Sequence, residues 1–220
     1  ISVICPYYGF ARQDIGNDST ARFIGTLLAT AGAQELITFE VHNPGIFDSY
    51  ALPVANLSMN EFYGEFLKGL NLKKPMIVTP DRGGTERALT LALGWPLAII
   101  EKGRTGPNNS HVKGIVGDVK GNDCVLFDDL CDTGGTLCQG ASALMDLGAK
   151  SVQAVCAHGV LSKGALKAIE NSPLKKVYFS NSIPLVYDPK AFSKVKEVCL
   201  STFIGDAIIQ IESQRRRNTG

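Results

Sequence analysis

The sequence has no excess of charge of either sign, no long apolar run and no paired cysteines. Its 22 Lys and Arg residues nearly balance 21 Asp and Glu, giving a net charge of +1, so we expect neither a nucleic acid nor a membrane as partner. The apolar runs are too short to span a bilayer, and no signal sequence opens the chain. The six cysteines are scattered without a CxxC pair or a Cys/His cluster. This argues against a disulfide framework or a zinc site and favours a reducing, cytoplasmic location.

The chain does contain a regular alternation of strand and helix patterns. Its 220 residues, 45% of them hydrophobic, are enough to bury a globular core. Periodicity predicts strands at 2–7, 36–41, 76–79, 96–100, 125–127, 151–157, 176–180 and 195–200. It predicts helices at 21–31, 60–70, 85–93, from Thr136 to Leu147, at 164–171 and from about Thr202. This alternation is typical of an α/β fold with parallel sheets flanked by helices.

A domain boundary is expected near Leu57 and Ser58, where one βα pattern stops and another starts. It divides the chain into residues 1–57 and residues 58–220. The chain starts at Ile1 inside a predicted strand, and from this we expect that an N-terminal segment is missing.

One stretch, CVLFDDLCDTGGTLC at 124–138, carries the clearest chemistry. It is a strand-to-helix turn, and open α/β sheets bind ligands at the carboxyl ends of their strands. Backbone N–H groups at a helix N-terminus, with glycines that allow close approach, suit a phosphate. Asp128 and Asp129 are acceptors suited to sugar hydroxyls or hydrated Mg²⁺. The stretch therefore predicts a site for a phosphorylated sugar, and the alternative is helix capping by Asp132 or Thr133 beside surface acids. The pattern GxxxxGK[ST] is absent, so this is not a Walker A loop.

VLFDDLCDTGGTL resembles the binding motif for phosphoribosyl diphosphate (PRPP) of type I phosphoribosyltransferases and of ribose-phosphate diphosphokinases (PRPP synthetases). The resemblance implies that the first two acids face the ribose hydroxyls and that the DTGGT loop holds the 5-phosphate. The ribose 5-phosphate contacts assigned in this way are Asp128, Asp132, Thr133, Gly134, Gly135 and Thr136.

Two further stretches distinguish the synthetase from the transferases. PYYGFARQD at 6–14 resembles the ATP-contacting signature of PRPP synthetases, which implies that Arg12 and Gln13 contact the nucleotide. VTPDRGGTERA at 78–88 resembles the strand, loop and helix around the diphosphate, which implies that Asp81 is a Mg²⁺-associated acid. The similarity covers residue 1 to about residue 212 and includes family scaffold stretches at 116–121 and 159–165.

His42 follows a predicted strand in TFEVHNPG. Alone it would be a structural histidine, whereas the resemblance implies contact with both the metal and the ATP. The family usually shows Asp-Leu-His and a longer acidic signature. Here the sequence is Glu40-Val-His42, and Ala51 and Ala55 stand where acids are common, so the rest of this segment is not assigned as a metal site.

The segment IIEKGRTGPNNSHV at 99–112 is rich in Gly, Pro and Asn, which predicts a mobile loop. It resembles the synthetase's catalytic loop, in which a Lys-x-Arg pair closes over the transferring phosphates. This assigns Lys102 and Arg104 as catalytic and adds Arg104 to the ribose 5-phosphate contacts. Gly103 stands where the family usually has arginine. The alternative is a surface loop with solvated cations.

The resemblance implies an enzyme that makes PRPP and AMP from ATP and ribose 5-phosphate with Mg²⁺, for nucleotide biosynthesis. It also implies two phosphoribosyltransferase-like domains, the N-terminal one incomplete here, and a homo-oligomer built as a hexamer. Two alternatives are a catalytically silent regulatory subunit and a PRPP-using phosphoribosyltransferase. Lys102 and Arg104 argue against the first, and PYYGFARQD argues against the second.

Overall fold

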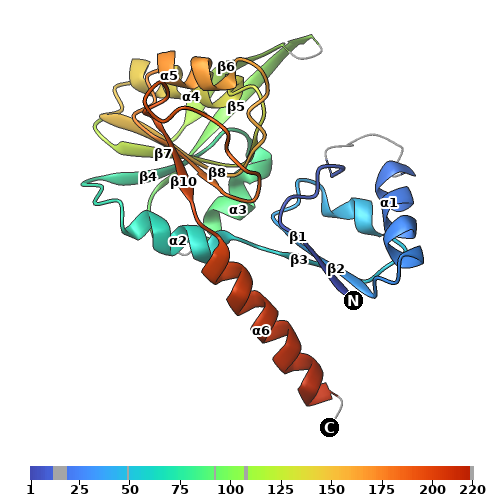
Figure 1. Ribbon diagram of the computed structural model, residues 1–220. Coiled ribbons are helices and arrows are strands. Elements are labelled where there is room, and N and C mark those ends of the chain that lie inside the picture. Colours follow the sequence, from blue (N-terminus) through green and yellow to red (C-terminus); the bar gives the residue numbers. More distant parts are fainter. Residues whose placement is uncertain (12–18, 49, 92, 107–108, 219–220) are drawn as a thin grey trace.

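The computed structural model describes residues 1–11, 19–48, 50–91, 93–106 and 109–218. These residues form two β-sheets that share no strand among them, one of three strands and one of seven. Figure 1 shows the small sheet beside the large one, with helices around both. Within the described ranges, every helix is either too short or too polar to cross a lipid bilayer.

The small sheet consists of three parallel strands with β2 in the middle. They are β1 (Ser2–Cys5), β2 (Glu35–Phe39) and β3 (Val54–Leu57). Helix α1 (Ser19–Thr30) connects β1 to β2, and a 3₁₀ turn, η1 (Pro44–Phe47), precedes β3. Ala21 of α1 packs with Leu36 and Tyr8 in the core on one face of this sheet.

The large sheet has the strand order β10-β9-β8-β7-β4-β5-β6. Its strands are β4 (Pro75–Thr79), β5 (Leu97–Gly106), β6 (Asn109–Val116), β7 (Asp123–Cys131), β8 (Ser151–Gly159), β9 (Val177–Ser180) and β10 (Val195–Val198). All neighbouring strands are parallel except β5 and β6. The prediction of an α/β fold with parallel sheets flanked by helices is confirmed.

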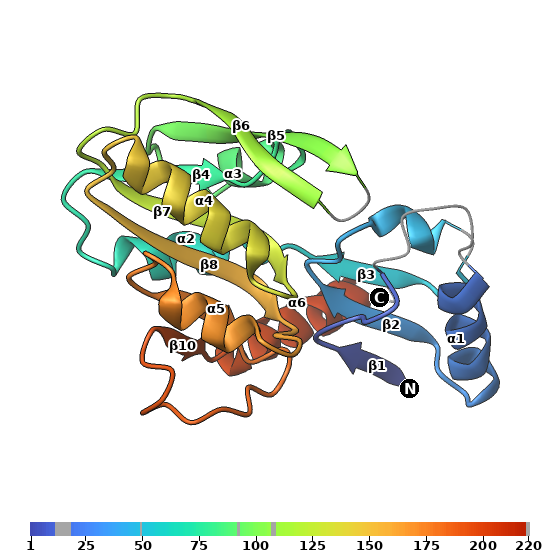
Figure 2. The ribbon, with the colours of Figure 1, turned by 90° about the horizontal axis from the view of Figure 1, so that it is seen from above.

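Helices cover both faces of the large sheet (Figure 2). Helices α4 (Gly135–Asp146) and α5 (Ala165–Asn171) lie on one face, and α2 (Asn60–Lys68) and α6 (Ser201–Asn218) lie on the other. Strand β7 is buried between them. Its Leu126 packs in the core that contains α4, and its Val125 and Phe127 pack in the core that contains α2 and α6. Because successive side chains of a strand point to opposite faces, a continuous apolar run fills both cores.

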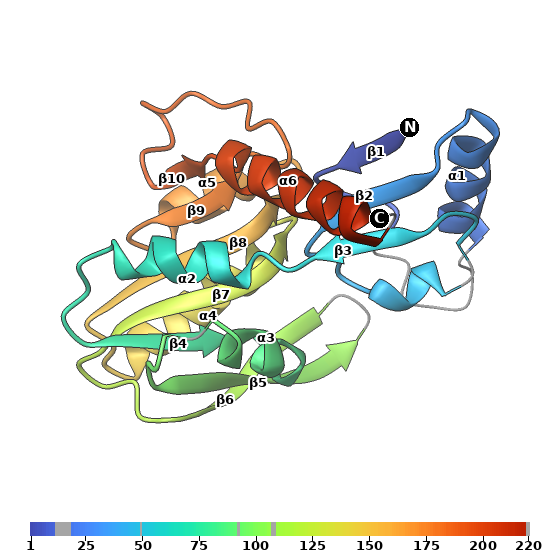
Figure 3. The same ribbon diagram turned by 90° about the horizontal axis from the view of Figure 1, so that it is seen from below.

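Helix α6 joins the two sheets. It leaves β10 and runs across to the small sheet (Figure 3). The ring of its Phe203 lies 5.7 Å from the ring of Phe39 in β2, measured between centroids. Near its end, Arg215 forms an ion pair with Glu35 at the start of β2. The C-terminal helix therefore supplies part of the apolar cover of the small sheet.

The prediction of an irregular loop at 99–112 is wrong over the described part of this segment, and its mobility stays a prediction. Strands β5 and β6 pair as an antiparallel hairpin there, with Lys102 opposite Val112 and Arg104 opposite Ser110. Cross-strand hydrogen bonding outweighs the weak strand propensity of glycine and asparagine, which context commonly overrides. Strand β3 was not predicted, and the helix after Gly84, α3 (Thr85–Leu89), is shorter than the predicted 85–93. The predicted domain boundary falls in the link between β3 and α2, and the division into domains stays a prediction.

Candidate active site

The fold brings three of the motifs to one edge of the large sheet. Strands β7, β4 and β5 are neighbours. One motif lies at the carboxyl end of β7, another lies at that of β4, and the third forms the carboxyl-terminal part of β5. Parallel strands direct these ends to the same edge. Segments that are some 20 to 50 residues apart in the printed sequence therefore meet.

The first component is the turn between β7 and α4. Gly134 has φ +77°, a left-handed conformation that favours glycine, and Gly135 begins the helix. The N–H of Gly135 donates to Oγ1 of Thr133 over 3.4 Å. Beneath the turn, the N–H of Ser162 donates to the carbonyl of Asp132. This turn presents the backbone of a helix N-terminus at the sheet edge, the arrangement that suits an anion.

The second component is the adjacent acid pair. Asp128 is half-buried and Asp129 is buried. Burial, and then the charges of Asp129 and Asp81, raise the pKa of Asp128 well above its usual range. Burial also acts to raise the pKa of Asp129, but its contacts with His42 and Arg87 outweigh that effect and lower it. The pair therefore contains one carboxyl that resists ionisation and one that is held ionised.

The third component is the turn between β4 and α3, which contains a 3₁₀ turn, η2 (Arg82–Gly84). Asp81 accepts a hydrogen bond from the N–H of Gly84 over 3.2 Å. Its other oxygen lies 3.5 Å from Nζ of Lys102 on β5. Because β4 and β7 are neighbouring strands, this Lys–Asp pair lies at the same sheet edge as Asp128.

His42 enters from the small sheet, just after β2. Its Nδ1 lies 2.5 Å from Oδ2 of Asp129. The ring of Tyr7, after β1, lies 4.9 Å from the ring of His158 at the end of β8. The carboxyl ends of both sheets thus face each other across a small hollow that Tyr7, His42, Asp129 and His158 help to line.

Some assigned residues cannot be placed. Arg12 and Gln13 lie outside the described residues. The backbone of Arg104 belongs to β5, but its side chain lies outside the described part of the structure. Among the described residues, Lys102 contacts Asp81 and His42 contacts Asp129. Asp128 and the turn 132–136 lie at the carboxyl end of β7, which neighbours β4.

Sequence reasoning missed Arg87 and Glu40 as residues of this site. Nε of Arg87 lies 2.8 Å from Oε1 of Glu40, and its Nη1 lies 3.2 Å from Oδ1 of Asp129. Arg87 stands in the first turns of α3, in the stretch VTPDRGGTERA, and only its place in the sequence hinted at a role. Both oxygens of Asp129 are thus engaged by Arg87 and His42, although the resemblance implied that this acid faces the ribose.

The described residues do not gather three or more His, Cys, Asp or Glu side chains that could hold a metal alone. Mg²⁺ in phosphate-transferring sites is usually held by one or two carboxylates together with substrate phosphates. Asp81 and Asp128 supply carboxylates of this kind at the sheet edge. These oxygen ligands fit Mg²⁺, whereas an imidazole such as that of His42 is a ligand more typical of transition metals.

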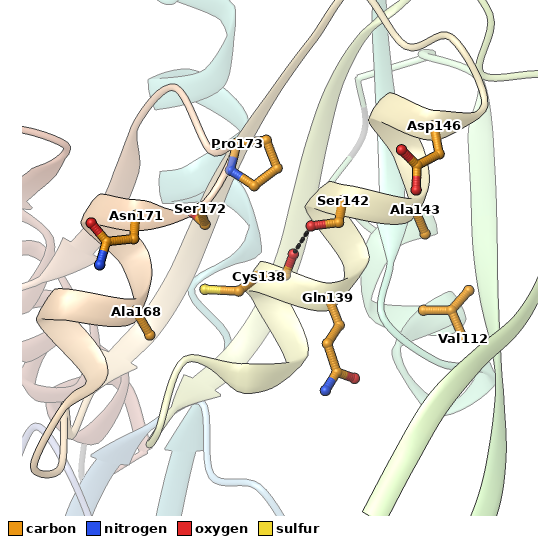
Figure 4. A pocket seen from close by; sticks show the side chains of 10 residues that line it. All are labelled: Val112, Cys138, Gln139, Ser142, Ala143, Asp146, Ala168, Asn171, Ser172 and Pro173. Atoms are coloured by element: carbon orange, nitrogen blue, oxygen red, sulfur yellow. Dashed lines mark hydrogen bonds between the residues drawn. The ribbon is translucent and has the colours of Figure 1, made fainter.

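Two larger hollows lie elsewhere. One, of about 660 Å³, lies between α4, α5 and β6. Figure 4 shows Cys138 of α4 turned toward Ala168 and Ser172 across it. The other, of about 760 Å³, runs between α2 and α6. The predicted site residues whose side chains the structure describes lie outside the lining of both, so the strand edge is the candidate site.

Comparison with known proteins gives the family. A model of the phosphoribosyl synthetase-associated domain matches residues 98–217. The ribose-phosphate pyrophosphokinase of Bacillus subtilis is 40% identical over 221 residues, which cover 98% of this chain and 69% of the relative. That of Corynebacterium ammoniagenes is 40% identical over 217 residues, covering 96% and 68%. The crystal structure of phosphoribosylpyrophosphate synthetase from Mycobacterium smegmatis matches with a TM-score of 0.82 at 29% identity, covering 97% of this chain and 72% of the other. The chain belongs to the ribose-phosphate pyrophosphokinase, or PRPP synthetase, family.

Proposed function

We propose that this protein transfers the diphosphoryl group of ATP to the 1-hydroxyl of ribose 5-phosphate, forming PRPP and AMP. One observation carries the proposal. In a chain of this family, an anion-binding turn, a half-buried acid and a Lys–Asp pair meet at one sheet edge. The comparisons give no support to the silent subunit or to the PRPP-using transferase.

The sugar site in this proposal is the turn after β7. Backbone N–H groups from Asp132 to Thr136 bind the 5-phosphate, since a helix N-terminus stabilises negative charge. Asp128 accepts hydrogen bonds from the ribose hydroxyls. Its raised pKa reflects burial beside other acids, and hydroxyl donors or a bound cation would stabilise its ionised form.

The nucleotide site lies between the sheets. Arg12, Gln13 and His42 contact ATP, and His42 and Asp81 hold the Mg²⁺ that accompanies it. When bound, the ion neutralises charge on the phosphate oxygens. Lys102 and Arg104 complete the cationic surroundings of the transferring group. In this proposal Arg104 contacts ribose 5-phosphate as well.

The chemistry needs little covalent participation by the protein. Phosphoryl transfer spreads charge over the phosphate oxygens, and positioning and electrostatic stabilisation supply most of the catalysis. Lys102, paired with Asp81 of the neighbouring turn, and Arg104 of the same strand are suited to this task by their charge.

Release of AMP that depends on ribose 5-phosphate tests the proposal directly. The full-length protein is incubated with ATP and Mg²⁺, with and without the sugar phosphate. The enzyme releases AMP only with the sugar. A silent subunit releases none under either condition, and a phosphoribosyltransferase instead releases diphosphate from PRPP when given a base. Either of these last two outcomes rejects the proposal.

Assembly, location and domain division belong to the same proposal. We expect a homo-hexamer in the cytoplasm, with domains divided near Leu57. Light scattering of the purified protein measures the mass of the assembly, and a monomeric mass contradicts this part.

A further inference from the structure

A chain of polar contacts, built on two buried carboxylates, connects the two sheets beneath the candidate site. It runs from Glu40 after β2, through Arg87 of α3, to Asp129 of β7, and it ends at His42. Glu40 is 8% exposed and Asp129 4%. Removing one member of a buried charge pair is costly because the partner is left uncompensated, so this chain defines a specific arrangement of the two sheets.

Glu40 is held in place from several directions. Its φ of +46° is rare for a residue other than glycine and persists only where the surroundings enforce it. Its N–H donates to the carbonyl of Leu57, and its Oε2 accepts from the N–H of Met59 over 2.8 Å. Its Oε1 is the oxygen that meets Arg87. This conformation aims the carboxylate from the small sheet at the large one.

Arg87 uses two different nitrogens of its guanidinium group to contact two carboxylates. Nε meets Glu40 and Nη1 meets Asp129, so one side chain bridges acids from different sheets. Its backbone carbonyl accepts from Nδ2 of Asn60 over 3.3 Å, which anchors α3 to α2. A lysine ammonium is a single point charge and does not reproduce a planar fork with separate donors.

Asp129 links Arg87 to His42 through its two carboxylate oxygens. Its Oδ1 takes Arg87, and its Oδ2 takes Nδ1 of His42. A carboxylate on one ring nitrogen fixes the tautomer and the orientation of an imidazole. The His42 side chain is 45% exposed, so its ring is held from the buried side and reachable from the other.

We propose that Arg87 and Asp129 are positioning residues for His42, and that of the two adjacent acids only Asp128 serves the sugar. The kinetic part rests on the proposed function, in which His42 faces the nucleotide. The structural part does not, because the tautomer of His42 exists whether or not the protein makes PRPP.

The structural part is tested by nitrogen NMR of the histidine rings in the full-length protein, recorded while the pH is raised until the His42 signals stop changing, because a tautomer exists only in the neutral ring. The His42 signals are identified by their loss in His42→Gln. We expect the Nδ1-protonated tautomer in the parent and its conversion to the Nε2-protonated form in Asp129→Asn. An unchanged tautomer in Asp129→Asn overturns the proposal.

The kinetic part compares Asp129→Asn and Arg87→Lys with His42→Ala. Each of these three variants should raise KM for ATP by about tenfold or more, the loss expected for a hydrogen bond to a charged group. KM for ribose 5-phosphate should stay within about twofold of the parent value, well below that loss. Combining Asp129→Asn with His42→Ala should add little to His42→Ala alone, because interacting positions are not additive. Arg87→Lys supplies the same test if Asp129→Asn does not fold.

Glu61→Gln, at an exposed acid of α2, is the matched control and should leave both constants unchanged. A rise in KM for ribose 5-phosphate as large as that for ATP would make Asp129 a sugar ligand. Fully additive losses in the double variant would make the bridge a merely structural feature. Both results overturn the proposal. If the parent releases no AMP, the proposed function fails while the NMR result still decides the tautomer.

Discussion

Nζ of Lys102 lies 3.5 Å from Oδ2 of Asp81, across the neighbouring strands β5 and β4. The lysine side chain is 27% exposed and the aspartate 52%. An ion pair this open to water contributes at most about 1 kcal/mol. In the proposed mechanism, Lys102 therefore exchanges Asp81 for a phosphate at little cost, which leaves Asp81 to a metal ion.

Lys102→Ala should lower kcat by roughly 100-fold or more with little change in either KM. The reason is that charge stabilisation realised in the transition state affects turnover more than binding. Steady-state kinetics of the full-length enzyme check this. Lys113→Ala, at an exposed position of β6 in the same hairpin, is the control and should leave kcat unchanged. A kcat for Lys102→Ala within about threefold of the parent, far from the loss given above, would remove its catalytic role.

Arg104→Ala should behave as Lys102→Ala does, because both cations serve the same developing charge. The double variant should lose less than the product of the two single losses, since residues that act as a unit are not additive. Comparing kcat of all four proteins under the same conditions measures this. Independent, multiplicative losses would mean that the two cations act at separate places.

Gly135→Val should abolish tight binding of ribose 5-phosphate and leave the fold intact. A Cβ at Gly135 would meet Oγ1 of Thr133 at 3.5 Å, an ordinary contact, so the added bulk enters the phosphate cradle instead of the core. Calorimetric titration with ribose 5-phosphate and thermal unfolding check the two halves. Gly205→Val is the control, since among the described residues a Cβ there meets open space. Parent-like affinity in Gly135→Val would reject the assignment.

Asp81→Asn should raise the Mg²⁺ concentration needed for half-maximal AMP release by about tenfold, the scale for loss of one charged contact. Removing one carboxylate matters because Mg²⁺ uses only one or two of them beside substrate phosphates. The measurement is a Mg²⁺ titration at fixed ATP. Asp206→Asn, at an exposed position of α6, is the control. Equal Mg²⁺ dependence in Asp81→Asn and the parent would exclude Asp81 from the metal site.

Asp123 should contribute to stability and leave catalysis unaffected, because it lies at the start of β7, at the opposite edge of the sheet. It accepts from Oγ of Ser151 over 2.7 Å and from the N–H of Lys73 over 3.1 Å. These bonds, that from Ser151 first, lower the pKa of Asp123. Asp123→Asn should lose about 1–3 kcal/mol of unfolding free energy at neutral pH, measured by urea unfolding.

The pH dependence of that loss has a fixed sign. A carboxyl whose pKa is lowered in the folded state stabilises the fold above its ordinary pKa of about 4, and this contribution disappears as the pH falls through the folded-state value. The difference between parent and Asp123→Asn should therefore shrink in strong acid. Asp146→Asn, at an exposed acid of α4, should show no difference. If the difference in unfolding free energy between the parent and Asp123→Asn stays constant down to strong acid, Asp123 does not stabilise the fold through its lowered pKa.

Local patterns predicted most of the elements. The run from Val125 to Phe127 was readable as a buried strand, and the glycines at 134 and 135 marked the turn, because periodicity and backbone freedom act over a few residues. The same local chemistry pointed to a phosphorylated sugar. Strand β3 was missed and the hairpin at 99–112 was mistaken for a loop, since strand pairing depends on a partner that a local window does not contain.

The sequence by itself determined the α/β class, the phosphate turn and the set of acids and cations around it. Tertiary structure alone decided that Asp129 turns inward to Arg87 and His42 while Asp128 remains at the edge. It also decided that Lys102 meets Asp81 and that α6 covers the small sheet. These outcomes depend on contacts between residues 20 to more than 160 positions apart in the printed sequence. Such contacts form only when the sheets pack, because a charge finds its partner by its position in space and not by its neighbours along the chain.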